Sequence, residues 1–306
     1  MNDRRTFLKV LAGAVAAAAP TARLTAQTTP AAAASAPRGI RKSILINMLP
    51  KELPYAGRFA MARKAGFEAI EMQTIARDEE AAEIKEAAAG AGLRIHSVMN
   101  MDHWRLPLSS ADPDVVRQSV AGMETSLRNA KLWGADTVLL VPAVVDARTG
   151  YKDAYQRSQL VIRERILPMA RDLKVVVAVE EVWNKFLLSP VEFARYVDEF
   201  DSPWLKAYFD VGNVVLFAFP QDWIRTLGPR IVKLHLKDFT LDRRNGTFAW
   251  KPIGEGDIDW VEVRRALQDI KYDGYATTEV TGGDAAYLQD LSARVDRFLA
   301  GQKPVG

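Results

Sequence analysis

The segment Val175-Val-Val-Ala-Val-Glu180 is a short apolar run that ends on a carboxylate, and similar runs occur three more times along the chain. Leu205–Asp210 ends on an aspartate, Ile231–His235 on a histidine and Tyr275–Glu279 on a glutamate. Runs of this length and composition are typical of β-strands. In a (β/α)8 barrel the C-terminal ends of parallel strands meet at one mouth. Four side chains able to bind a divalent metal are therefore expected together.

Short strand-like runs alternate with helix-like segments from Ile40 onward. The expected strands are Ser43–Asn47, Phe67–Met72, Leu93–Val98, Thr137–Val141, Val175–Glu180, Leu205–Asp210, Ile231–Leu236 and Tyr275–Glu279. The expected helices are Tyr55–Lys64, Glu79–Ala89, Asp112–Trp133, Ala154–Asp172, Ser189–Phe200, Gln221–Leu227, Trp260–Ile270 and Asp284–Leu299. This order predicts an α/β chain with a single (β/α)8 TIM-barrel domain rather than an open doubly wound sheet. No G-x-G-x-x-G fingerprint follows the first strand, which also disfavours a dinucleotide-binding fold.

Side-chain alternation indicates which strand residues face the barrel interior, because successive side chains point to opposite faces. In the strand ending at Leu236, the aliphatic residues share one face, so His235 is expected on the inner one. Glu71 is expected to face inward by the same argument. Alternation also favours Glu180 over Glu181 as the inward carboxylate, but strands often twist at their ends, so this choice stays open.

The N-terminus resembles an export signal. Arg4-Arg5 precedes the apolar run Val10–Ala19, and small residues suited to cleavage follow, which is the pattern of a twin-arginine leader. We predict a signal peptide over residues 1–26, a flexible linker over 27–38 and the barrel over 39–306, with a periplasmic or secreted location. The apolar run is too short for a stable membrane anchor; an uncleaved anchor or a disordered tail is the alternative.

Charge and cysteine content exclude several classes of protein. The chain has 41 basic and 38 acidic residues, and residues 1–38 hold five of the basic and one of the acidic ones. The remaining 36 basic and 37 acidic residues give a net charge of about −1, which disfavours nucleic acid as a partner. The chain has no cysteine, so disulfides and thiolate metal sites are excluded.

The chain resembles the sugar isomerase/epimerase superfamily of xylose isomerase-like barrels, in particular its ketose 3-epimerase and hydroxypyruvate isomerase branch. The stretches that carry the resemblance are Val177–Phe186, Ala207–Asn213, Val232–Asp238, Gly254–Trp260 and Ala276–Glu279. The resemblance implies one divalent cation, usually Mn²⁺ with Co²⁺ or Mg²⁺ as substitutes. Its implied ligands are Glu180, Asp210, His235 and Glu279.

A site of three carboxylates and one imidazole suits hard cations such as Mn²⁺ or Mg²⁺. Such a cation stabilises an enediolate, and a glutamate on each side of a sugar can remove and return a proton. We expect Glu180 and Glu279 to be this catalytic pair and Asp238 to orient His235. The residues expected to bind substrate are Glu71, His96, Trp183, Asn213 and Lys237.

Two departures from the resemblance concern the substrate. Some members have a histidine three residues after the metal-binding aspartate, where this chain has Asn213. The segment Phe239–Lys251 is expected to be a long basic loop, and its Arg243 and Arg244 suit a phosphate. Export argues instead for an unphosphorylated sugar.

The leading hypothesis is a metal-dependent isomerase or epimerase that acts on a ketose or keto-sugar. A metal-dependent 3-keto-glycoside lyase or hydrolase would use the same residues, but enolisation would then expel the glycosidic group. A non-catalytic periplasmic sugar-binding protein is the alternative of another class. A multi-metal nuclease on a similar barrel is disfavoured because the chain has only three histidines. The resemblance is also compatible with a homo-oligomer.

Overall fold

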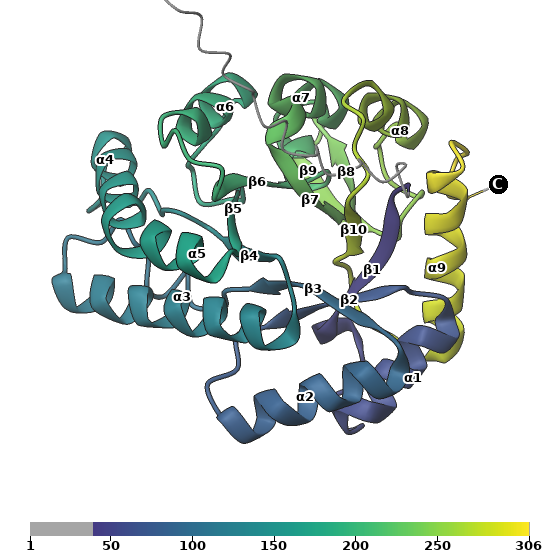
Figure 1. Cartoon of the computed structure of the whole chain (residues 1–306). Helices are drawn as coiled ribbons and strands as arrows, with labels where there is room; N and C mark the ends of the chain where they lie inside the picture. The colour runs from purple at the N-terminus through teal and green to yellow at the C-terminus, as the bar shows by residue number, and fades with distance from the viewer. Residues whose placement is uncertain (1–38, 306) are drawn as a thin grey trace, which may run out of the picture. The chain divides into compact units, whose positions relative to one another are not determined.

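The computed structural model describes residues 39–305, which form a closed barrel of eight parallel strands (Figure 1). The strands are β1 (Arg41–Leu45), β2 (Ala69–Gln73), β3 (Arg94–Met99), β4 (Thr137–Leu140), β5 (Val176–Glu180), β6 (Leu205–Asp210), β7 (Ile231–Leu236) and β10 (Tyr275–Thr278). Their order around the barrel is β1-β10-β7-β6-β5-β4-β3-β2. The expected (β/α)8 architecture is confirmed. The predicted signal peptide (1–26) and linker (27–38) lie outside the described residues.

Helices surround the strands (Figure 1). They are α1 (Tyr55–Ala65), α2 (Asp78–Ala91), α3 (Pro113–Trp133), α4 (Tyr151–Val161), α5 (Leu167–Leu173), α6 (Pro190–Asp198), α7 (Pro220–Leu227), α8 (Trp260–Asp269) and α9 (Ala285–Leu299). Short 3₁₀ turns occupy Ile46–Met48, Asn213–Leu216 and Gly228–Arg230. The start of α3 follows from its sequence, because the Asp112 carboxylate accepts a hydrogen bond from the Asp114 amide at 2.8 Å and Pro113 follows the cap.

The expected helix over Ala154–Asp172 is interrupted. A π-helical turn spans Ile162–Ile166 and separates α4 from α5. Pro168 explains the break, since it has no N–H for the carbonyl four residues earlier and its ring would clash with that carbonyl. A π turn is a known way to relieve such a conflict within a helix.

The expected loop over Phe239–Lys251 is instead an antiparallel hairpin. Its strands are β8 (Asp238–Asp242) and β9 (Thr247–Lys251), and Phe239 pairs with Trp250. The turn places Gly246 at φ +66°, a conformation that glycine adopts without strain. The loop prediction was wrong. Two short strands joined by a tight turn are enough to form a hairpin, and strands this short leave little pattern in the sequence.

The core has two parts of different chemistry. Aliphatic side chains such as Val177, Val179 and Leu234 are fully buried. The buried set also includes polar strand residues such as Glu71 and Tyr208, which hydrogen bond to each other at 2.5 Å. Burial of polar groups is costly unless they are paired, so this network fixes the side chains that support the barrel mouth.

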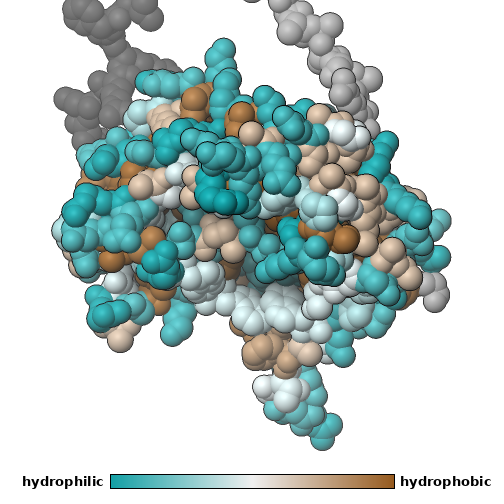
Figure 2. Space-filling view, turned by 90° about the horizontal axis from the view of Figure 1, so that it is seen from below, coloured by the Kyte–Doolittle hydropathy of each residue, from teal (hydrophilic) through white to brown (hydrophobic). Residues whose placement is uncertain are grey.

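The face shown in Figure 2 carries hydrophilic residues with hydrophobic ones scattered among them. Within residues 39–305, no helix combines the length and apolar character needed to cross a bilayer.

Candidate metal centre

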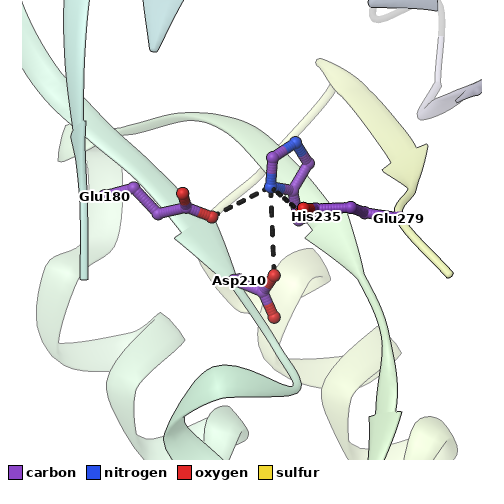
Figure 3. A group of neighbouring side chains, drawn as sticks. All are labelled: Glu180, Asp210, His235 and Glu279. Atoms are coloured by element: carbon purple, nitrogen blue, oxygen red, sulfur yellow. Dashed lines mark hydrogen bonds and ion pairs between the residues drawn. The ribbon is translucent and has the colours of Figure 1, made fainter. Parts of the chain in front are cut away.

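Four side chains from four strands converge at the C-terminal ends of the barrel strands (Figure 3). Glu180 ends β5, Asp210 ends β6, His235 lies in β7 and Glu279 directly follows β10. One donor atom from each residue lies within 4.8 Å of those of the other three. The sequence prediction that these residues meet is therefore confirmed in space.

The donors are arranged around one imidazole nitrogen. His235 Nδ1 lies 2.9 Å from Glu180 Oε1, 2.8 Å from Glu279 Oε2 and 3.9 Å from Asp210 Oδ2. Asp210 is held by its other oxygen, because Oδ1 accepts hydrogen bonds from the backbone amides of Gly212 at 2.7 Å and Asn213 at 3.0 Å. The tight turn after β6 thereby leaves Asp210 Oδ2 for the centre.

The donor set fits a divalent cation. Asp210 Oδ2 and Glu279 Oε2 are buried and accept no hydrogen bond from the part of the chain that the structure describes. Both lie 3.0 Å from Lys237 Nζ, but these contacts lack hydrogen-bond geometry. Three carboxylates close together, two of them buried and that of Glu279 partly exposed, repel one another unless a positive charge lies among them. Carboxylate oxygens with one imidazole nitrogen suit Mn²⁺ or Mg²⁺.

Positive side chains next to these carboxylates balance their charge. Burial lowers the pKa of His235, but Glu279, Glu71 and Glu180 outweigh it and raise that pKa well above its usual value. Burial raises the pKa of Glu180 to about 7 against the opposing effect of His235. Burial would also raise the pKa of Glu279, but His235 and Lys237 lower it to about 2. A bound divalent cation would be the largest local charge and would replace this arrangement.

Glu71 is the partner of the other imidazole nitrogen. Its Oε2 lies 2.9 Å from His235 Nε2 and accepts a hydrogen bond from the Tyr208 hydroxyl. Glu71 is fully buried behind His235, so the expectation that it binds substrate directly is corrected. Metal-binding histidines commonly use a carboxylate in this way to fix the orientation of the ring.

Asp238 does not orient His235, contrary to expectation. Its Oδ2 accepts hydrogen bonds from the Gly254 amide at 2.7 Å and from Trp260 Nε1 at 2.9 Å. Asp238 therefore ties the hairpin to the segment before α8. The prediction failed because Asp238 does not continue β7 but begins β8 of the hairpin.

His96 is expected at the substrate but lies inside the packed barrel. Its side chain is fully buried, and Nε2 lies 2.9 Å from Ser43 Oγ and 3.1 Å from Thr277 Oγ1. The ring also stacks on Tyr275 with centroids 4.3 Å apart. His96 is thus a core histidine, and the substrate-binding expectation is corrected.

Lys237 lies beside the donor cluster, where it reaches Asp210 and Glu279. Burial lowers its pKa, but the two carboxylates outweigh this effect and keep the ammonium charged. The Asn213 side chain donates to the Glu181 carbonyl at 3.1 Å. Trp183 Nε1 donates to the Asn213 carbonyl at 2.9 Å. Trp183 and Asn213 thus connect the loops next to the donors. Lys237, which was also expected to bind substrate, lines the open space beside the donor cluster.

Glu181 is the other candidate that the sequence left open. The structure places Glu180, not Glu181, in the donor cluster. Glu181 is 3% exposed, and neither carboxylate oxygen has a hydrogen-bond partner within residues 39–305. Burial, followed by the charges of Asp210 and Glu180, raises its pKa well above the usual range. It is a buried, unpaired carboxyl group next to the site.

A cavity of about 480 Å³ adjoins the donor cluster. Its inner end is formed by Lys237 and Glu279, and its walls include Trp250 on β9 and Tyr287 on α9. Sequence reasoning missed Tyr287, which lies in the first turn of a helix and matches no motif.

The closed barrel and its Glu-Asp-His-Glu group define a (β/α)8 protein with a site suited to one divalent cation. The chain belongs to the xylose isomerase-like TIM barrel family, whose sequence profile matches residues 59–296.

Known relatives include sugar epimerases. The chain is 27% identical over 246 residues to a putative L-ribulose-5-phosphate 3-epimerase of Escherichia coli strain K12, covering 74% of this chain and 83% of the relative. A D-tagatose 3-epimerase-like protein superimposes with a TM-score of 0.72 at 18% identity, covering 85% and 97% of the two chains. The 3-keto-D-glucoside 4-epimerase of Escherichia coli gives 0.69 at 14% identity, with 84% and 99% covered. The two solved structures support the fold alone.

Proposed function

We propose that the protein is a divalent-metal-dependent sugar epimerase that moves a proton at the carbon next to a ketose carbonyl. The observation that carries this proposal is the convergence of two glutamates, one aspartate and one histidine from four strands. The curated relative named as a 3-epimerase of a ketose phosphate supports the reaction class. Mn²⁺ is the proposed cation, with Mg²⁺ or Co²⁺ as substitutes.

The proposed metal ligands are Glu180, Asp210, His235 and Glu279. When bound, the cation supplies Lewis-acid stabilisation of negative charge on the sugar oxygens. Glu71 keeps His235 Nδ1 directed at the centre through the 2.9 Å contact with Nε2. The backbone amides of Gly212 and Asn213 hold Asp210 in the same way.

Glu180 and Glu279 are the proposed acid–base pair. They approach the centre from different sides in Figure 3, from β5 and from the end of β10. A carboxylate on one side can take the proton next to the carbonyl, and a carboxyl group on the other can return one to the opposite face. Lys237 lies 3.0 Å from Glu279, where its ammonium group can also donate to a sugar oxygen.

A keto-glycoside lyase or hydrolase is the second candidate, and the cavity next to Glu279 favours it because the cavity offers room beyond the donor cluster. We further propose export through the twin-arginine leader, which fits a sugar substrate outside the cytoplasm.

Product analysis tests the two reactions. The Mn²⁺-loaded protein is incubated with free ketoses and with 3-keto-glycosides, and products are separated by chromatography. A new epimer supports the epimerase, whereas a released aglycone assigns the lyase or hydrolase. Binding of sugars with no product from any of them would identify a sugar-binding protein and contradict the proposal.

A further inference from the structure

The cavity beside the donor cluster has an aromatic outer part, whose lining also includes the exposed Lys251. Trp250 is 47% exposed and forms one wall. Tyr287, in the first turn of α9, and Pro252 also line this part. The inner end, formed by Lys237 and Glu279, belongs to the proposed catalytic site. The cavity therefore joins the reacting centre to an aromatic surface.

The Trp250 ring is held firmly in place. It stacks on Trp183 with ring centroids 5.1 Å apart and an interplanar angle of 16°. The edge contact with Phe239 has a centroid distance of 5.0 Å. Gly212 permits this arrangement, since a Cβ there would lie 2.6 Å from Lys237 Cβ and 3.2 Å from Trp250 Cζ3. A fixed, half-exposed indole next to a catalytic centre is well suited to ring stacking.

The floor of the cavity is also rigid. The floor consists of Glu279 to Gly282. A Cβ on Gly282 would lie 2.3 Å from the Met48 carbonyl oxygen, so the segment lies directly against the 3₁₀ turn after β1. The space between Trp250 and Tyr287 is therefore preformed, as ligand sites usually are.

The cavity lining holds two lysines, Lys237 and Lys251, and neither suits a phosphate at the outer end of the cavity. Lys237 lies 3.0 Å from both Asp210 and Glu279, so its charge is already balanced. Lys251 follows Trp250 directly in β9, so its side chain points to the opposite face of the hairpin. No arginine belongs to the cavity lining that the structure describes. Arg243 and Arg244 lie in the hairpin turn, on the order of 15 Å along β9 from Trp250 at the usual rise per residue.

We propose that the outer part of the cavity is a second subsite that binds an uncharged ring, either a second sugar or an aromatic aglycone, joined by a glycosidic bond to the sugar at the donor cluster. This inference rests on the proposed function, because it extends that same site. The ring stacks on Trp250, and the substrate is a glycoside rather than a sugar phosphate. A cavity of about 480 Å³ lies within the range of sites for ligands larger than one sugar ring.

Binding of unreactive glycosides tests the subsite separately from catalysis. Methyl and phenyl β-D-glucoside lack a ketone, so they report binding alone when titrated calorimetrically into the Mn²⁺-loaded protein. We expect phenyl glucoside to bind about 10-fold more tightly than methyl glucoside, as ring stacking and burial predict. Trp250→Ala should remove this difference in affinity between the two glucosides. Trp250→Phe should restore most of it.

Phe248→Ala is the matched control, because Phe248 is an exposed aromatic residue of the same strand that does not line the cavity. It should keep the full preference for phenyl glucoside. Equal affinity of the wild-type protein for both glucosides, or no measurable binding of either, overturns the subsite. An equal loss in the Trp250 and Phe248 variants overturns it too. Loss of a dimer in Trp250→Ala, seen by light scattering, would assign Trp250 to a contact between two copies and overturn it as well.

The outcomes separate the subsite from the proposed function. If free ketoses are epimerised but neither glucoside binds, the subsite is wrong and the epimerase proposal stands. If phenyl glucoside binds through Trp250 but no ketose or keto-glycoside is converted, the subsite stands and the proposed reaction fails.

Discussion

Glu71 Oε2 lies 2.9 Å from His235 Nε2, and both side chains are fully buried in the barrel. The contact fixes the imidazole so that Nδ1 faces the three other donors. The Tyr208 hydroxyl holds the same oxygen of Glu71. The barrel interior thus sets the geometry of the candidate metal centre, although Glu71 itself does not reach it.

Replacing Glu71 by glutamine should weaken metal binding. The neutral amide forms a weaker contact with His235 Nε2, so the imidazole is oriented less firmly and is a poorer metal ligand. We expect the dissociation constant for Mn²⁺ to rise by about 10- to 100-fold, as measured by calorimetric titration. Glu68→Gln, at an exposed carboxylate just before β2, is the control and should bind Mn²⁺ as the wild type does. Unchanged affinity in Glu71→Gln would show that this contact does not support the centre.

Substitutions at Glu180 and Glu181 distinguish the two adjacent carboxylates. Glu180 contributes a donor atom to the cluster, whereas Glu181 does not. Glu180→Gln should therefore weaken Mn²⁺ binding by at least about 10-fold, since a charged ligand next to His235 is lost. Glu181→Gln, which changes a neighbouring buried carboxylate in the same way, should bind Mn²⁺ nearly as well as the wild type. The reverse order of affinities would make Glu181 the ligand.

Metal binding should stabilise the fold, because a cation that binds only the native state shifts the unfolding equilibrium. At free Mn²⁺ 100-fold above the dissociation constant, the gain is about 2.7 kcal/mol. For a chain of this size we expect Tm to rise by roughly 5–10 °C over the EDTA-treated protein, as measured by calorimetry. Asp210→Asn should show a much smaller rise. An identical Tm with Mn²⁺ and with EDTA would indicate that the donor cluster binds no metal.

His103 should make the protein less stable at mildly acidic pH. Burial lowers its pKa to about 4 from 6.5, although a hydrogen bond with the Asn100 backbone opposes the shift. Between these values the unfolded chain binds a proton that the native protein does not. The unfolding free energy therefore falls as pH drops from 6.5 to 4, by up to roughly 3 kcal/mol from this residue.

The variant His103→Gln cannot titrate, so its unfolding free energy should decline less steeply than that of the wild type over this interval. Denaturant unfolding at several pH values measures the difference. At pH 8 His103 is neutral in both states, and the two proteins then show only the general effect of the substitution. Parallel curves between pH 6.5 and 4 would contradict the assignment.

The four candidate metal ligands were predictable because each lies at the C-terminal end of a recognisable strand. In parallel strands, a residue at the C-terminal end reaches the barrel mouth whatever the details of packing. Glu180, Asp210, His235 and Glu279 could therefore be identified from the sequence, and the structure brings them together.

Other residues could not be placed, since alternation gives the face of a strand but not the depth within the barrel. His96 and Glu71 both face inward, yet both are fully buried. Their partners, Thr277 for His96 and Tyr208 for Glu71, come from strands far along the chain. The cavity likewise depends on how the β8–β9 hairpin lies relative to α9, which no local pattern specifies.

Deuterium incorporation from D₂O into ketoses and 3-keto-glycosides tests the central claim most directly. The Mn²⁺-loaded wild type and Glu279→Gln are compared at confirmed metal occupancy, and protein and metal are removed before NMR spectra are recorded. We predict deuterium at the carbon next to the carbonyl with the wild type, and exchange at least about 100-fold slower with Glu279→Gln. Exchange at the wild-type rate in the metal-loaded variant, or none with the wild type on any of these sugars, would contradict the account.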